Sequence, residues 1–98
     1  MARAVAELRS WPALAASDTR RGLTFAVRGT EILRLSGPDQ VQVRLTAPAI
    51  DRLGHYLREC VQVHECADGA WVAVQVEAEP DLELLFALTS VAIKAHVP

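Results

Sequence analysis

Large apolar and polar residues alternate along the stretch from Leu23 to Leu45, and this is the clearest pattern in the chain. A period of two is typical of strands that bury one face of a sheet. The pattern predicts strands over residues 23–28, 31–36 and 40–45. Gly29-Thr30 suits a two-residue type II′ turn between the first two strands. A second turn is predicted over residues 36–39, so we expect an antiparallel meander on which the rest of the chain packs.

Three helices are predicted outside the meander. An amphipathic helix is expected over residues 2–11, followed by a connector over residues 13–22. A second helix begins near Pro48 and a third near Pro80, because proline is tolerated in the first turn of a helix. Gly54 falls on the apolar stripe of the second helix. A residue without a side chain at that place predicts close approach of the helix backbone to the sheet.

A second hairpin completes the expected fold. Strands are predicted over residues 61–66 and 71–76, and Asp68-Gly69 between them is typical of a type I′ turn. The element order is then α-β-β-β-α-β-β-α. This order predicts a single α+β domain over residues 1–98, with a mainly antiparallel five-stranded sheet and the helices on one face.

The alternation divides the strand residues into an inward and an outward set. The inward set is apolar and comprises Leu23, Phe25, Val27, Leu33, Leu35, Val41, Val43, Val61, Val63, Val72, Val74 and Val76. The outward set comprises Thr24, Arg28, Ile32, Arg34, Gln42, Arg44, Gln62, His64, Cys66, Trp71 and Gln75.

The outward set carries the candidate binding residues. Arg28, Arg34 and Arg44 give one arginine to each meander strand, and His64 and Trp71 share their face. Arginine forks bind carboxylate and phosphate, and an aromatic ring on the same surface supplies an apolar anchor. We therefore predict an anion- or ligand-binding surface. Trp71 is expected to be partly exposed, or covered by a partner and not by the core between sheet and helices. The alternative is an ordinary solvated sheet face.

The charge distribution favours such a surface and argues against a dedicated nucleic-acid binder. The net charge is only −2 over 98 residues, about half of which are hydrophobic. Residues 20–58 hold seven arginines and three acids, a net +4, whereas residues 59–98 hold seven acids and one lysine, a net −6. Such asymmetry creates a local field that the total charge conceals. A small anionic ligand or an acidic protein is therefore the expected partner.

No targeting or membrane segment is predicted. Glu7 and Arg9 interrupt the apolar residues near the start, and the apolar run over residues 84–93 is too short to span a bilayer. With two cysteines and no secretory signal, a cytoplasmic protein with free thiols is the expectation.

The sequence contains no catalytic motif, and no cofactor is predicted. His55, Cys60, His64 and Cys66 do not form a metal site by spacing, because helical geometry separates the first two residues. His64 and Cys66 do share a strand face. They are the basis of one alternative function, a small enzyme or a metal-dependent accessory protein. A second alternative is a weak nucleic-acid binder that uses Arg28, Arg34 and Arg44.

Several short motifs resemble one known family. They are Leu8-x-x-Trp11-Pro12, Gly22-x-x-Phe25-x-Val27-x-Gly29-x-Glu31-Ile32, Gly37 and Trp71-Val72. On these motifs the chain resembles the luciferase-domain proteins, which are small α+β proteins of uncharacterised function. The family pattern has a His-x-His pair after Glu-Ile, where Arg34 and Ser36 stand here. The resemblance therefore implies the fold. It does not imply chemistry that needs the two histidines, and it does not imply light emission. A weaker resemblance, in element order alone, is to the MmcQ/YjbR-like proteins, whose winged shape has suggested DNA binding.

The last predicted helix has more apolar surface than one sheet can cover. Its first stripe suits the sheet, while Leu84, Leu88, Val91 and Ala95 form a second stripe. The N-terminal helix is too short to cover all of this second stripe. We therefore expect a homodimer joined partly through the C-terminal helix, since two-fold dimers are the commonest oligomers.

Overall fold

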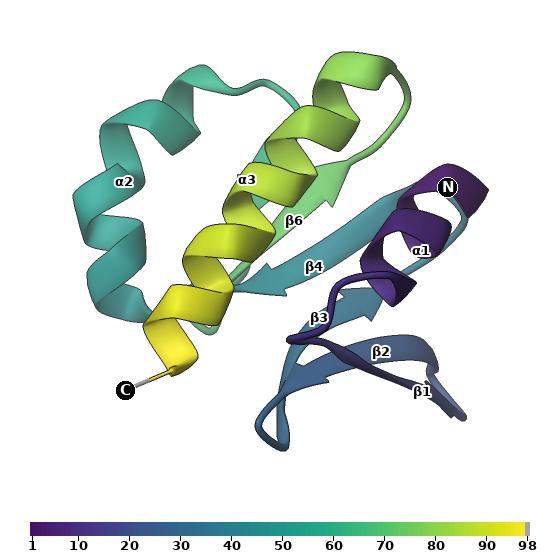
Figure 1. Cartoon of the computed structure of the whole chain (residues 1–98). Coiled ribbons are helices and arrows are strands. Elements are labelled where there is room, and N and C mark those ends of the chain that lie inside the picture. Colours follow the sequence, from purple (N-terminus) through teal and green to yellow (C-terminus); the bar gives the residue numbers. More distant parts are fainter. Residues whose placement is uncertain (98) are drawn as a thin grey trace.

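The computed structural model describes residues 1–97 and has an α+β architecture in two layers (Figure 1). The helices are α1 (Ala2–Arg9), α2 (Ala47–Glu59) and α3 (Glu79–His96). The strands are β1 (Ala15–Thr19), β2 (Gly22–Val27), β3 (Thr30–Leu35), β4 (Gln40–Arg44), β5 (Val63–Glu65) and β6 (Trp71–Gln75). They form one sheet in the order β1-β2-β3-β4-β6-β5, with every neighbouring pair antiparallel. The helices lie on one face of this sheet, as predicted.

The sheet has six strands, and the prediction of five was wrong. The connector expected over residues 13–22 contains β1, which pairs with β2 from Ala15 opposite Ala26 to Thr19 opposite Gly22. All five side chains of β1 are exposed. An edge strand of this kind is held by its backbone hydrogen bonds, so it leaves no alternation of apolar and polar residues in the sequence.

The turn between β2 and β3 is Arg28-Gly29, one residue earlier than predicted. Val27 pairs with Thr30, and both turn residues have positive φ, 50° at Arg28 and 82° at Gly29. Positive φ at both central positions defines a type I′ turn, so the type II′ prediction was wrong. Arg28 consequently lies at the tip of the hairpin and not on the face of the sheet.

A β-bulge in β3 reverses the predicted direction of Ile32. Phe25 pairs with Leu33, but the next residue, Ala26, pairs with Glu31, so Ile32 is the extra residue on β3. Ile32 and Leu33 are consecutive and both are fully buried in the core. The prediction that Ile32 points outward was wrong, because a bulge shifts the alternation by one residue.

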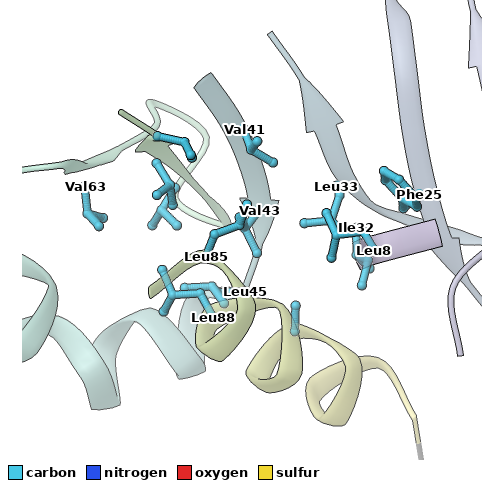
Figure 2. Close-up of a cluster of buried hydrophobic side chains, with 14 of the residues drawn as sticks. Leu8, Phe25, Ile32, Leu33, Val41, Val43, Leu45, Val63, Leu85 and Leu88 are labelled. Atoms are coloured by element: carbon cyan, nitrogen blue, oxygen red, sulfur yellow. The ribbon is translucent and has the colours of Figure 1, made fainter. Parts of the chain in front are cut away.

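The core lies between the sheet and the helices, and its strand residues are mostly the predicted ones (Figure 2). Val41, Val43, Val72 and Val74 are completely buried. Leu23 and Leu35 are only partly buried and pack against the core cluster. Leu8 of α1 and Leu85 and Leu88 of α3 supply apolar contacts from the helix layer.

The second hairpin differs in detail from its prediction. Strand β5 begins at Val63, so Val61 precedes it and is 90% exposed, which makes the inward prediction for Val61 wrong. Cys66 donates its backbone N–H to the carbonyl oxygen of Trp71, so the loop closed by this bond consists of the four residues 67–70. A type I′ turn needs positive φ at both central residues. In the described part of this loop Gly69 has positive φ and Asp68 does not, so Asp68-Gly69 is not the predicted type I′ turn.

Helix α2 begins as predicted but packs differently at Gly54. The backbone N–H of Ala49 donates to the Thr46 hydroxyl, which caps the helix, and Pro48 lies in its first turn. A Cβ built on Gly54 would lie 3.2 Å from Nη1 of Arg58. Gly54 therefore makes room for an arginine of its own helix, and the predicted close approach to the sheet was wrong.

Two different elements flank α3. Trp11, which follows α1, packs on Phe86 with ring centroids 5.9 Å apart. Leu53 and Leu57 of α2 line the same groove as the second apolar stripe of α3, where Leu88 is buried.

No helix in the described residues is long and apolar enough to cross a membrane.

Candidate functional site

The outer face of the sheet is the face that the helices leave open. Cross-strand pairing aligns one row of outward residues across all six strands: Ser17, Thr24, Arg34, Gln42, Ala73 and His64. Directly paired residues point to the same side of a sheet. The register therefore confirms the outward direction predicted for Thr24, Arg34, Gln42 and His64.

A hollow of about 490 Å³ opens on this face beside the β1–β2 turn. We call it the arginine hollow. Its lining residues are Thr19, Arg20, Arg21, Thr24, Glu31, Arg34, Leu35, Ser36 and Gln42. Of the three predicted arginines only Arg34 lines it. Arg28 lies at the far end of the β2–β3 hairpin, and Arg44 lies beside Trp71.

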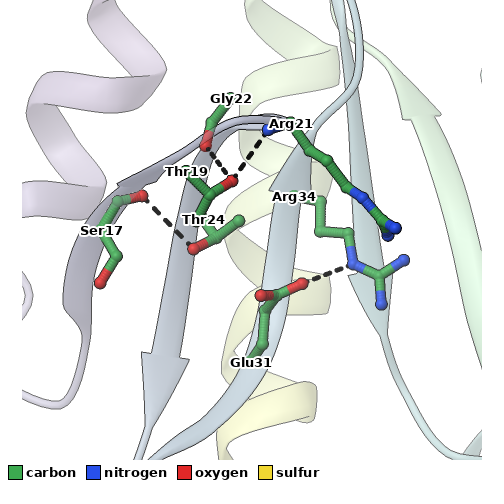
Figure 3. A network of polar contacts seen from close by, with 7 residues as sticks. All are labelled: Ser17, Thr19, Arg21, Gly22, Thr24, Glu31 and Arg34. Carbon is green, nitrogen blue, oxygen red and sulfur yellow. Dashed lines mark hydrogen bonds and ion pairs between the residues drawn. The ribbon is translucent and has the colours of Figure 1, made fainter.

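Arg20 and Arg21 belong to the hollow and were missing from the predicted site. They form the turn between β1 and β2, which Thr19 organises (Figure 3). Its hydroxyl donates to the carbonyl oxygen of Gly22 at 2.8 Å and accepts from the backbone N–H of Arg21 at 3.2 Å. The Arg20-Arg21 pair was visible in the sequence, but its position at a hairpin turn depended on β1, which has no sequence signature.

Arg34 is the central basic side chain of the hollow. Its Nε donates to Oε1 of Glu31 at 2.5 Å, which fixes the direction of the guanidinium group. Figure 3 shows the side chains of Arg21 and Arg34 extending to the same side of the structure. Because Glu31 engages Nε, the two Nη groups of the arginine fork face away from that contact. The contact with Glu31 does not use these donors.

Trp71 lies on the predicted face but is not exposed as predicted. It pairs with Arg44 across β4 and β6, and the guanidinium carbon of Arg34 lies 3.9 Å from its ring centroid. Only 6% of Trp71 is exposed. Trp71 lies outside the main core cluster, so arginine cover and not helix packing shields its ring. Nε of Arg44 is buried and has no hydrogen-bond partner among the described residues.

The comparison with protein families shows to which family the chain is related. A family model described as the luciferase domain matches residues 29–92, which is more than half of the sequence. The chain belongs to the luciferase domain family. No curated protein and no solved structure matches it significantly. The weaker resemblance to the MmcQ/YjbR-like proteins is not confirmed by these comparisons.

The luciferase domain match covers only part of the arginine hollow. It begins at Gly29 and so includes β3, with Arg34, and the following Ser36. Arg20 and Arg21 precede the matched region. The hollow is therefore built where strands of the luciferase domain meet a hairpin that lies before the matched region.

His64 and Cys66 do not form an activated pair in this luciferase domain protein. His64 is exposed on β5, and burial raises the pKa of the Cys66 thiol. The carboxylate of Asp68 raises this pKa further, and the Arg34 guanidinium only partly opposes the effect. A cysteine nucleophile needs a lowered pKa. In the part of the chain described, no three metal-ligating side chains come together. The structure therefore does not favour the enzyme or metal-dependent alternative.

The raised pKa of Cys66 predicts a slow alkylation reaction. In a Cys60→Ser variant, the rate of reaction with iodoacetamide should rise with pH to a midpoint above that of the same chain unfolded in urea. Burial disfavours the thiolate only in the folded state, and the unfolded chain is the matched control. A folded midpoint below the unfolded one would contradict this result and identify Cys66 as an activated thiol.

Proposed function

We propose that this chain is a small binding module of the luciferase domain family that takes an anionic ligand in the arginine hollow. One observation carries the proposal: Arg20, Arg21 and Arg34 come from two separate hairpins and line the same hollow. Like charges repel, so three arginines around one open space need a counter-charge to be favourable.

The chemistry of the lining suits phosphate or carboxylate groups. Three arginines and one glutamate give the lining a net charge of +2, and Glu31 is already engaged by Nε of Arg34. Thr19, Ser36 and Gln42 add neutral hydrogen-bonding groups. Arginine forks bind both kinds of oxyanion through paired N–H groups. A ligand with one or two such groups fits this lining.

The family pattern supports the same place. By the resemblance to the luciferase-domain pattern, Arg34 and Ser36 take the positions of its His-x-His pair, and both line the hollow. Here these positions offer a permanent positive charge and a hydroxyl group in place of two imidazoles. The substitution suits binding of an anion more than proton transfer, because a guanidinium remains protonated at ordinary pH.

The test is titration calorimetry with inorganic phosphate and with pyrophosphate at low salt, where surface electrostatics are strongest. We expect binding by the native chain and a loss of about tenfold or more in affinity in an Arg20→Ala/Arg21→Ala variant. Both residues are exposed, so the variant should fold normally.

The matched control removes two arginines from elsewhere. Arg28→Asn/Arg52→Ala has the same change in net charge, and asparagine tolerates the positive φ at position 28. The control should bind phosphate nearly as well as the native chain does. No binding by the native chain at low salt, or equal losses in both variants, would mean that the outer face is an ordinary solvated surface.

A further inference from the structure

We propose that two copies of this chain form an antiparallel dimer through the surface made by α2 and α3. This surface lies on the helix side of the sheet, away from the arginine hollow. The inference is therefore independent of the proposed anion binding. It rests on an apolar groove and on the order of exposed residues along α3.

The groove between α2 and α3 is apolar throughout. It has a volume of about 240 Å³ and is lined by Leu53, Tyr56, Leu57, Cys60, Leu84, Ala87, Leu88 and Val91. Tyr56 is 73% exposed at this surface, and Leu84 and Val91 are half-buried. Helix α2 thus covers only part of the second apolar stripe of α3. A groove beside an exposed aromatic residue is typical of a protein interface.

A strip of exposed residues on α3 borders this groove. Glu83, Ala87, Ser90 and Lys94 are all exposed and are spaced by four, three and four positions. This spacing places them on one side of a helix. Ala87 also lines the groove, so the strip and the groove form one continuous surface.

The strip is symmetric in a way that selects a second copy as the partner. Glu83 and Lys94 lie equally far from the point midway between Ala87 and Ser90, about 8 Å along the axis at 1.5 Å per residue. In an antiparallel pair with its two-fold axis at this point, Glu83 faces Lys94 of the partner copy. Ala87 then faces Ser90 of the partner copy, and these small residues allow the helices to approach closely.

Opposite charges of two copies therefore face each other only when the two α3 helices are antiparallel. A parallel pairing in register would place like charges opposite each other. A two-fold interface uses the same surface on both subunits, so each favourable contact occurs twice. The exposed Tyr56 and the half-buried Leu84 and Val91 lie beside the pairing helices and would be covered in the same contact.

Sedimentation equilibrium with three charge variants tests the pairing. Glu83→Lys should raise the dimer dissociation constant about tenfold, because two pairs of opposite charges become pairs of like charges. Lys94→Glu should have a similar effect. The double variant Glu83→Lys/Lys94→Glu should return the dissociation constant to within about threefold of the native value, since opposite charges face each other again.

A control variant separates this contact from a general effect of charge. Asp18→Lys changes the net charge by the same amount on β1, at the opposite edge of the sheet from β5, which contacts α2. It should leave the dissociation constant unchanged. A native chain that stays monomeric at about 200 μM would overturn the proposal, because a specific dimer of even modest affinity would form there. A double variant as weak as the single ones would also overturn it.

Discussion

Replacing Trp71 with alanine is expected to lower the free energy of unfolding by about 3–5 kcal/mol. Trp71 lies on the outer face, where a sheet residue is ordinarily solvated and its loss is nearly neutral. Here only 6% of the residue is exposed, and the guanidinium of Arg34 covers its ring. Truncation removes this large apolar contact and leaves the arginine without its stacking partner. Urea denaturation followed by circular dichroism at one fixed protein concentration measures the change.

Gln75 provides the matched control for this prediction. It lies on the same strand and points to the same face as Trp71, and it is half-buried. Gln75→Ala should change the free energy of unfolding by no more than about 0.5 kcal/mol. If Trp71→Ala is as mild as this control, the ring is not buried and the original expectation of an exposed Trp71 is correct.

Replacing Ile32 with alanine is expected to cost about 2–5 kcal/mol, because the side chain is completely buried. Val61→Ala should cost no more than about 0.5 kcal/mol, since Val61 is 90% exposed. These two variants serve as controls for each other. A simple alternation predicts that Ile32 points outward and Val61 inward, so it gives the opposite order of effects.

The same urea titration distinguishes the two possibilities. A larger loss for Val61→Ala than for Ile32→Ala would contradict the bulge at Ile32 and the late start of β5. Equal and small losses would contradict the bulge alone. The expected order requires both features together, which makes the pair a direct test of the register of the sheet.

The outward direction of two candidate residues could be predicted, but the set of residues that lines the arginine hollow could not. Alternation with Leu33 and Leu35 was enough to assign Arg34 to the outer side, because the side-chain period of a strand is two. Alternation with Val41 and Val43 did the same for Gln42. It could not assign Arg28, since the hairpin turn lies one residue earlier than the pattern suggested. A single-residue difference in a turn decides whether an arginine lies on a face or at a tip.

Arg20 and Arg21 show a different limit. Their neighbours in β1 are small or polar and exposed, so nothing in the local pattern indicates a strand. The strand exists because β2 offers a free edge with unpaired backbone groups. Only when β1 pairs with that edge do its turn residues come beside Arg34, which is more than ten positions away in the chain.

The sequence by itself determined the family, the α+β class, the three helices, the meander and the apolar face of the sheet. The family follows from short motifs. The other features follow from local periodicity, from turn residues and from the prolines in the first turns of α2 and α3. The tertiary structure decided the sixth strand, the bulge at Ile32, the cover over Trp71 and the membership of the arginine hollow. Each of these depends on backbone pairing or side-chain contact between two separate segments, which a periodic pattern within one segment does not encode.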